Sequence, residues 1–264
     1  MDILVCMKQV PDTNVQIKVA PDGKDIDRSG IAYVINPYDE LALEVAIRTK
    51  EKSGGTVTLV TIGPDRVTEQ IRAALAMGVD RAIHVKDPKL DSADHFQIAK
   101  VLAAVAKKNP HQVILCGKQA VDDYAFIVGP ALAEYLDYPH VAFAKQIEFS
   151  ADGKSATIDR EGEGEIEVVE CPLPAVITVE KGVNGIVDAR YPALPDIIKA
   201  KKKEIQTMNL EELGMGNQEL GEVRVVIEKY STPPPKAEGK ILKGEPAETV
   251  PQLIKLLKEE AKVL

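Results

Sequence analysis

Short apolar runs alternate with helix-like periodicity along most of the chain. Five runs rich in β-branched residues are typical of buried strands, at residues 3–7, 56–62, 81–85, 113–117 and 175–179. Several of these runs are apolar throughout rather than alternating, which predicts a parallel sheet covered on both faces. Right-handed crossovers would then bring the carboxyl ends of the strands to one ligand-facing edge.

The segments between these runs have the 3.6-residue period of amphipathic helices. The predicted helices span residues 39–52, 66–77, 93–108 and 125–136. Asn36 stands at the N-cap of the first, Pro37 at its first helical position, and Gly78 closes the second. This order predicts a doubly wound α/β fold with a mostly parallel, Rossmann-like sheet. Two excursions interrupt it, a strand at 15–19 turning at 21–23 and an antiparallel stretch from 146 to 170.

The pattern changes after residue 203. Residues 222–230 keep strand-like content, whereas 231–243 include three consecutive prolines and predict an extended arm. Residues 250–264 predict an amphipathic helix with Leu253, Leu257, Ala261 and Leu264 on its apolar side. We therefore expect a nucleotide-binding domain over 1–220 and an arm with a terminal helix over 221–264. That helix either folds back or docks on a partner.

The composition and charge of the chain argue against several classes of function. The chain has 264 residues, 45% of them hydrophobic, and a net charge of −8, which argues against general nucleic-acid binding. It has no apolar run of membrane-spanning length and begins directly with a predicted strand, so we expect a cytoplasmic protein without a signal peptide. Cys6, Cys116 and Cys171 lack metal-ligand spacing, so we expect no metal site. No catalytic triad or paired-carboxylate motif can be assembled.

The best chemical motif follows the 113–117 strand, in Gly117-Lys118-Gln119-Ala120-Val121-Asp122-Asp123. A glycine at a strand end, followed by free backbone N–H groups at a helix start, suits a phosphate. Taken alone, the motif is more typical of an ordinary strand-to-helix turn capped by Asp122 or Asp123. The second helix start, Asn36-Pro37-Tyr38-Asp39, is predicted at the same edge. Two helix starts at one crevice could hold a nucleotide.

A second unusual segment runs from residue 189 to 203. Leu194 stands between Pro192 and Pro195, and a dense lysine run follows. The prolines stiffen the backbone, so the pattern predicts a surface loop that offers Leu194 to a pocket on another protein. The alternative is that Leu194 packs into its own core and the lysines form a solvated helix face.

The segment 190–203 resembles the signature of the electron transfer flavoprotein β subunit family, and the resemblance extends over essentially the whole chain, including Ala73-Ala74-Leu75-Ala76-Met77-Gly78. In that family the segment docks acyl-CoA and other flavin dehydrogenases. The implied docking residues are Arg190, Tyr191, Leu194, Pro195, Ile198 and Lys199.

The resemblance also implies an AMP site at the sheet edge. The residues implied to surround it are Cys6, Met7, Asn36, Pro37, Tyr38, Asp39, Ile62, Gly117, Lys118, Gln119, Ala120, Val121, Asp122, Asp123, Tyr124, Ala125, Phe126, Ile127 and Val128. Many family members continue the two aspartates with a third acid and Asn-Gln-Thr-Gly, whereas residues 126–128 here are Phe-Ile-Val. A phosphate would therefore depend on backbone N–H groups. Val128-Gly129-Pro130 resembles the end of the corresponding motif in electron-bifurcating relatives, which hold a second FAD at this site. A second FAD is therefore the alternative to AMP.

The function implied by the resemblance is that of an electron carrier subunit rather than an enzyme. A homologous α subunit would hold or share the redox FAD, with Arg160 and Glu161 of this chain facing that flavin. The implied partners are the α subunit, flavin dehydrogenases and a quinone-reducing oxidoreductase. A rival interpretation is an adenine-nucleotide hydrolase of related topology. Such enzymes place a Ser-Gly-Gly loop after the first strand, whereas Ser53-Gly54-Gly55 here precedes a strand.

Overall fold

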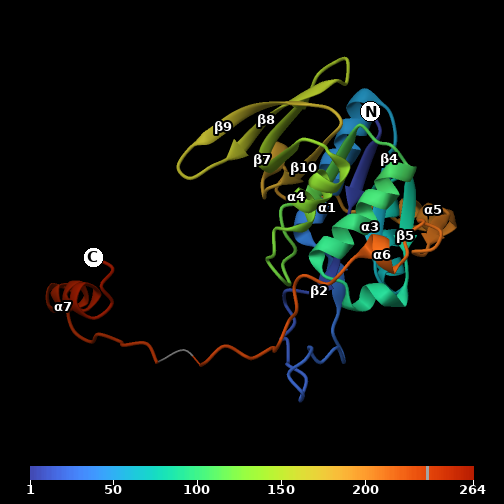
Figure 1. The fold of residues 1–264 in the computed structure, drawn as a ribbon. Helices are drawn as coiled ribbons and strands as arrows, with labels where there is room; N and C mark the ends of the chain where they lie inside the picture. The colour runs from blue at the N-terminus through green and yellow to red at the C-terminus, as the bar shows by residue number, and fades with distance from the viewer. Residues whose placement is uncertain (236–237) are drawn as a thin grey trace.

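The structure is a computed structural model that describes residues 1–235 and 238–264. Its main feature is a nine-stranded sheet in the order β11-β5-β4-β1-β6-β10-β7-β8-β9, beside a two-stranded sheet of β2 and β3 (Figure 1). The strands are β1 Ile3–Cys6, β2 Gln9–Pro11, β3 Tyr33–Ile35, β4 Val57–Ile62, β5 Arg81–Val85, β6 Val113–Gly117, β7 His140–Phe149, β8 Ser155–Glu161, β9 Ile166–Pro172, β10 Ala175–Val179 and β11 Ile205–Met208. The helices are α1 Pro37–Ser53, α2 Thr68–Met77, α3 His95–Lys108, α4 Val128–Leu136, α5 Leu194–Lys202, α6 Asn217–Leu220 and α7 Pro246–Glu259.

The sheet is parallel from β11 to β7, and its order reverses between β1 and β6. β1 pairs with β4 on one side, Ile3 opposite Val57, and with β6 on the other, Ile3 opposite Val113. From β1 the chain moves outward through β4 and β5, then returns to β6 and β10. The five predicted strands are confirmed within one residue at each end. The β1/β6 boundary is thus the topological switch point of the sheet, where ligands of such folds bind.

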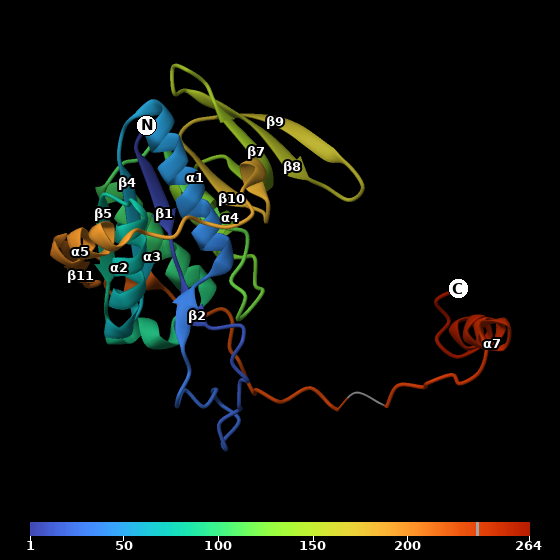
Figure 2. The ribbon, with the colours of Figure 1, turned by 180° about the vertical axis from the view of Figure 1, so that it is seen from behind.

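Helices cover both faces, which confirms the doubly wound fold class. α1 and α2 lie on one face and α3 and α4 on the other (Figure 2). The core is correspondingly divided by the sheet. Leu43, Ile47 and Ile71 pack on the α1 and α2 side, and Leu102 and Leu132 pack on the α3 and α4 side. Burial of these large side chains supplies most of the driving force for folding.

The predicted antiparallel excursion is confirmed but belongs to the main sheet. β7 pairs in parallel with β10 and antiparallel with β8, which in turn pairs with β9. β7 begins at His140, where it pairs in parallel with β10, and its antiparallel pairing with β8 begins at Ala144, two residues before the predicted start at 146. β9 is the sheet edge, and the β8–β9 hairpin projects beyond the helical layers (Figure 1).

The predicted strand at 15–19 is wrong, and the strand-like content of residues 222–230 does not produce a strand. Residues 15–19 form no strand, only a single bridge between Val19 and Ile26. Residues 222–230 pair with no strand of the described residues, and three of their amides bind other acceptors. The backbone N–H groups of Arg224 and Val225 both donate to the Asp94 carboxylate, and that of Tyr230 donates to the Gly23 carbonyl.

The C-terminal arm ends in α7, which lies apart from the body of the molecule (Figure 1). Residues 236 and 237 of the predicted arm lie outside the described residues. α7 begins earlier than predicted and ends before Ala261 and Leu264, so these two residues do not extend its apolar side. No residue of α7 is buried, and Leu253 and Ile254 are about half exposed. A division of the chain at residue 220 stays a prediction.

Candidate functional site

Asp39 and Asn36 join α1 to the ends of β1 and β6. The Asp39 carboxylate accepts the Lys8 amide at 2.8 Å and the Gly117 amide at 2.9 Å. The Asn36 side chain donates to the Gln119 carbonyl at 2.8 Å and accepts the Val121 amide at 3.1 Å. Asn36 occupies the predicted N-cap position but does not cap α1 with its side chain. Both side chains instead hold the 117–121 loop against the start of α1.

Gly117 is required where this loop leaves β6. A Cβ atom at this position would lie 2.5 Å from Asp39 Oδ1, 2.5 Å from Tyr38 Cβ and 2.9 Å from the Tyr38 carbonyl carbon. Two of these three contacts involve Tyr38, the second residue of α1. The close approach of strand end to helix start therefore admits only glycine.

Burial raises the pKa of Asp39 to about 7, although the Lys8 and Gly117 amides oppose the rise. The ordinary aspartate value is 3.8, so the folded state holds this proton more tightly than the unfolded chain between about pH 4 and 7. We expect the free energy of unfolding to fall as the pH rises through that window, by at most about 1.4 kcal/mol per pH unit. Urea unfolding of Asp39→Asn should give a lower but flatter pH profile, since a carboxamide accepts from only one amide. Exposed Asp91→Asn is the control, and parallel profiles for the wild-type protein and Asp39→Asn would disprove this role.

The two aspartates of the loop do not cap a helix. Lys8 Nζ lies 2.7 Å from both Asp122 Oδ1 and Asp123 Oδ2, and His95 Nε2 lies 3.0 Å from Asp123 Oδ2. Burial alone would raise the pKa of Asp123, but the hydrogen bond from His95 and the charge of Lys8 outweigh it and hold this pKa well below its usual range. The predicted helix start at 125 is therefore wrong. Asp123 instead accepts the Ala125 amide in a local turn, and α4 begins at Val128.

The Lys118 side chain is largely buried at the β1/β6 edge and does not extend into solvent. Its ammonium pairs with Glu180 and lies 5.2 Å from the Tyr38 ring centroid, 5.8 Å from Phe126 and 5.6 Å from Phe143. Phe126 and Phe143 contact each other and both have positive φ, 59° and 58°. Bulky residues rarely adopt that conformation outside sites where strain has a role. The Lys118 ammonium is thus paired with Glu180 and lies close to the rings of Tyr38, Phe126 and Phe143.

Two polar features at this edge have no protein partner within the part of the chain that the structure describes. Gln119 is only 8% exposed, and its Oε1 atom is buried without a hydrogen bond among the described residues. The first-turn amides of α4, including those of Val128 and Gly129, have no partner within the helix. Gly129 lies close to Thr178, whose Cγ2 would be 2.4 Å from a Cβ at position 129. An orphaned acceptor and free amides are complementary to a ligand that carries an amino group and an anion.

The remaining predicted residues lie at the strand ends, at the helix starts and in the loop. Cys6 and Met7 are buried at the end of β1, and Ile62 ends the neighbouring strand β4. Tyr124 and Ala125 lie in the loop before α4, and Tyr124 is 61% exposed. Pro37, Ala120 and Ile127 lie at the helix starts and in the loop.

The segment predicted as a docking loop is largely a helix. α5 starts at Leu194, with Pro195 in its first turn, because Pro at this position fits helical φ and has no amide to leave unpaired. Tyr191 is 95% exposed, Leu194 69% and Ile198 52%. Leu194 therefore does not pack into the core. Lys199 lies beside Asp196 on the exposed side of α5.

Arg190 points inward, to Glu44 of α1. Its Nε and backbone N–H donate to Glu44 Oε2 at 2.9 and 3.2 Å, and its guanidinium also contacts Glu51. Burial alone would raise the pKa of Glu44, but hydrogen bonds from Arg190 and Arg48 lower it below its usual value. Arg190 therefore anchors the segment to α1 rather than presenting its charge to solvent.

Arg160 and Glu161 lie at the end of β8, on the projecting hairpin. Arg160 Nη1 is 3.1 Å from Glu167, and Glu161 Oε2 is 2.9 Å from Lys145. Both predicted residues therefore take part in cross-strand ion pairs. Within residues 1–235 and 238–264, no cluster of three metal-ligating side chains is present, and no helix could cross a membrane.

Comparison with known proteins decides the family. The model of the electron transfer flavoprotein domain matches residues 24–213. The chain is 40% identical to the electron transfer flavoprotein subunit beta of Bacillus subtilis over 265 residues, covering 100% of both chains. It is 37% identical to that of Thermoanaerobacterium thermosaccharolyticum, covering 97% of this chain and 98% of the relative, and 36% identical to that of Mus musculus, covering 98% of each. This chain belongs to the electron transfer flavoprotein β subunit family. An electron-transfer role follows, and the rival assignment to a nucleotide hydrolase is set aside.

Several residues of this electron transfer flavoprotein subunit were not predicted from the sequence. Lys8 and Glu180 neutralise charges of the loop, His95 forms a hydrogen bond with Asp123, and Glu44 anchors Arg190. Of these residues, only Glu44 could have been found from the sequence pattern. It stands within the apolar positions of the predicted helix, where a carboxylate needs a partner.

Proposed function

We propose that this chain is the β subunit of a heterodimeric electron transfer flavoprotein in the cytoplasm. Its relatives are named as β subunits over their full length, which implies an α subunit partner. The exposed apolar residues of α7, on an arm leading away from the body, are suited to contact with that partner. Burial of this helix would remove apolar area from water that the chain alone leaves exposed.

The nucleotide we propose at the β1/β6 edge is AMP. The observation that carries this proposal is Gln119 Oε1, which is buried without a hydrogen-bond partner among the described residues, in the loop that Asn36 and Asp39 hold against the start of α1. The exocyclic amine of adenine is a donor of the kind that this oxygen lacks. Because Lys8 and Lys118 are each paired with carboxylates, the phosphate would be bound by backbone amides and the start of α4.

The exposed side chains of Tyr191, Leu194 and Ile198 support docking of a donor on α5. The proposed donors are acyl-CoA or other flavin dehydrogenases, and the proposed acceptor is a quinone-reducing oxidoreductase. FAD held by or shared with the α subunit would supply the redox chemistry, while this chain supplies position and electrostatics. In this arrangement Arg160 and Glu161 would face the flavin.

A second FAD in place of AMP is the alternative. It is favoured by the Val128-Gly129-Pro130 run, which resembles the same stretch in relatives that hold a second FAD, and by the aromatic ring of Phe126 at this loop, which lies against Phe143. The site would then belong to an electron-bifurcating flavoprotein.

Nucleotide content separates the two proposals. We expect the chain co-expressed with its α subunit to sediment as a heterodimer and to release one FAD and one AMP per heterodimer on denaturation, identified by mass. Two FAD together with reduction by NADH would replace the AMP assignment with bifurcation. A compact monomer with a protease-resistant arm, when the chain is expressed alone, would contradict the heterodimer.

A further inference from the structure

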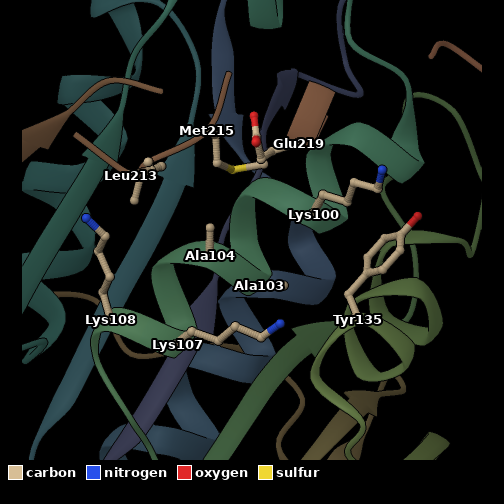
Figure 3. Close-up of a pocket in the computed structure, with 10 residues that line it drawn as sticks. Lys100, Ala103, Ala104, Lys107, Lys108, Tyr135, Leu213, Met215 and Glu219 are labelled. Atoms are coloured by element: carbon tan, nitrogen blue, oxygen red, sulfur yellow. The ribbon is translucent and has the colours of Figure 1, made fainter. Parts of the chain in front are cut away.

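A cleft of about 420 Å³ lies on the α3 face of the molecule, apart from the β1/β6 edge. α3 forms one wall, the segment before and within α6 forms another, and Tyr135 of α4 closes one end (Figure 3). Its floor is apolar, with Ala103, Leu213 and Met215 buried. The volume is within the range of small-molecule sites.

Three lysines of α3 surround this floor, Lys100, Lys107 and Lys108, against a single acid, Glu219 (Figure 3). Among the described residues none of the three forms an ion pair with a carboxylate. Lys100 Nζ donates to the Leu220 carbonyl and lies 5.7 Å from the Tyr135 ring centroid. Lys108 Nζ donates to the Glu212 carbonyl. The Glu219 carboxylate is occupied by the Gly216 amide at 2.8 Å.

The helix dipole of α3 accounts for only two of these three lysines. Lys107 and Lys108 lie in the last turn of α3, where cations complement the helix dipole. Lys100 lies two turns earlier, on the same side, and is only partly exposed. In a chain with a net charge of −8, unneutralised cations around one apolar floor produce a local positive potential that favours anions.

We propose that this cleft binds a small organic anion, with its carboxylate or phosphate at the lysines and its apolar body over the alanines and Met215. The site is separate from the proposed nucleotide site. A purely inorganic ion would leave the floor uncovered, and a neutral ligand would leave the lysines unpaired.

Met215 provides a local probe, because the chain has five methionines and only this one lines the cleft. The full-length chain, labelled with [methyl-¹³C]methionine and assembled with its unlabelled partner, is titrated with phenyl phosphate. We expect a saturable shift of the Met215 methyl signal, identified with Met215→Leu, at millimolar ligand. Inorganic phosphate and benzyl alcohol should each bind at least about threefold more weakly, because each supplies only half of the contacts.

Lysine variants test the charge. We expect Lys107→Gln and Lys100→Gln each to weaken phenyl phosphate binding by about threefold, as for partly exposed charges. Lys18→Gln, an exposed lysine outside the cleft, should bind like the wild-type protein. Lys107 is exposed, so its change leaves folding intact. An unmoved Met215 signal, equal shifts of all five signals, or equal affinity for benzyl alcohol would overturn the proposal.

Discussion

Replacement of Gly117 by alanine is expected to lower the free energy of unfolding by about 3 kcal/mol and to abolish nucleotide retention. The new Cβ would lie 2.5 Å from Asp39 Oδ1 and from Tyr38 Cβ, so α1 and the end of β6 must separate. That movement breaks the hydrogen bond from the Gly117 amide to Asp39 and releases the loop that Asn36 holds. Chemical denaturation and the nucleotide content of the purified heterodimer measure the two effects.

Gly162→Ala is the matched control, since its Cβ would meet only ordinary contacts at 3.5 Å. A second pair of variants tests the crowding argument at Gly129, another glycine of the same edge. Gly129→Ala should be destabilising because a Cβ there lies 2.4 Å from Thr178 Cγ2, and the next nearest atoms are 3.8 Å or more away. Thr178→Ser removes that methyl group and should restore much of the loss. If Gly117→Ala proves as stable as Gly162→Ala and retains nucleotide, the loop is not held in the way described.

The sheet edge was predictable because it depends on local pattern. Continuous apolar strands fix where β1 and β6 end, the Asn36-Pro37 pair fixes where α1 begins, and parallel topology brings these positions together. The start of α4 was not predictable. Asp122 and Asp123 have the composition of a helix cap, but Lys8, more than a hundred residues away in the chain, takes both carboxylates. The capping propensity of the two aspartates is overridden here by their ion pairs with Lys8, a tertiary contact.

The same limit explains the misassigned extended segments. Residues 222–230 are rich in β-branched side chains, but a strand needs a neighbour, and the Arg224 and Val225 amides meet the Asp94 side chain instead of another backbone. Likewise, two prolines around Leu194 indicated a loop, whereas Pro195 is compatible with a helical first turn and starts α5. Nothing in the local sequence of the 189–203 segment pairs Arg190 with Glu44, 146 positions earlier in the chain.

Leu194→Ala is expected to slow electron transfer from a flavin dehydrogenase several-fold or more while leaving the melting temperature and flavin content nearly unchanged. Leu194 is 69% exposed at the first position of α5, so its truncation removes little buried area from the folded chain. At an interface the same side chain can contribute about 1 kcal/mol or more, because docking would bury it. Coupled turnover over a range of carrier concentrations, beside a thermal melt, measures both quantities.

Two variants make the test specific. Leu132→Ala, on the buried side of α4, should lower the free energy of unfolding by about 2–5 kcal/mol whatever partner is present. Val187→Ala removes an exposed apolar side chain shortly before the segment and should alter neither stability nor coupling. Since Arg190 anchors this segment to α1 through Glu44, a loss of coupling in Leu194→Ala at unchanged stability would point to the exposed face of α5 itself. Reduced stability with unchanged coupling would place Leu194 among the packing residues and remove the basis for docking at this face.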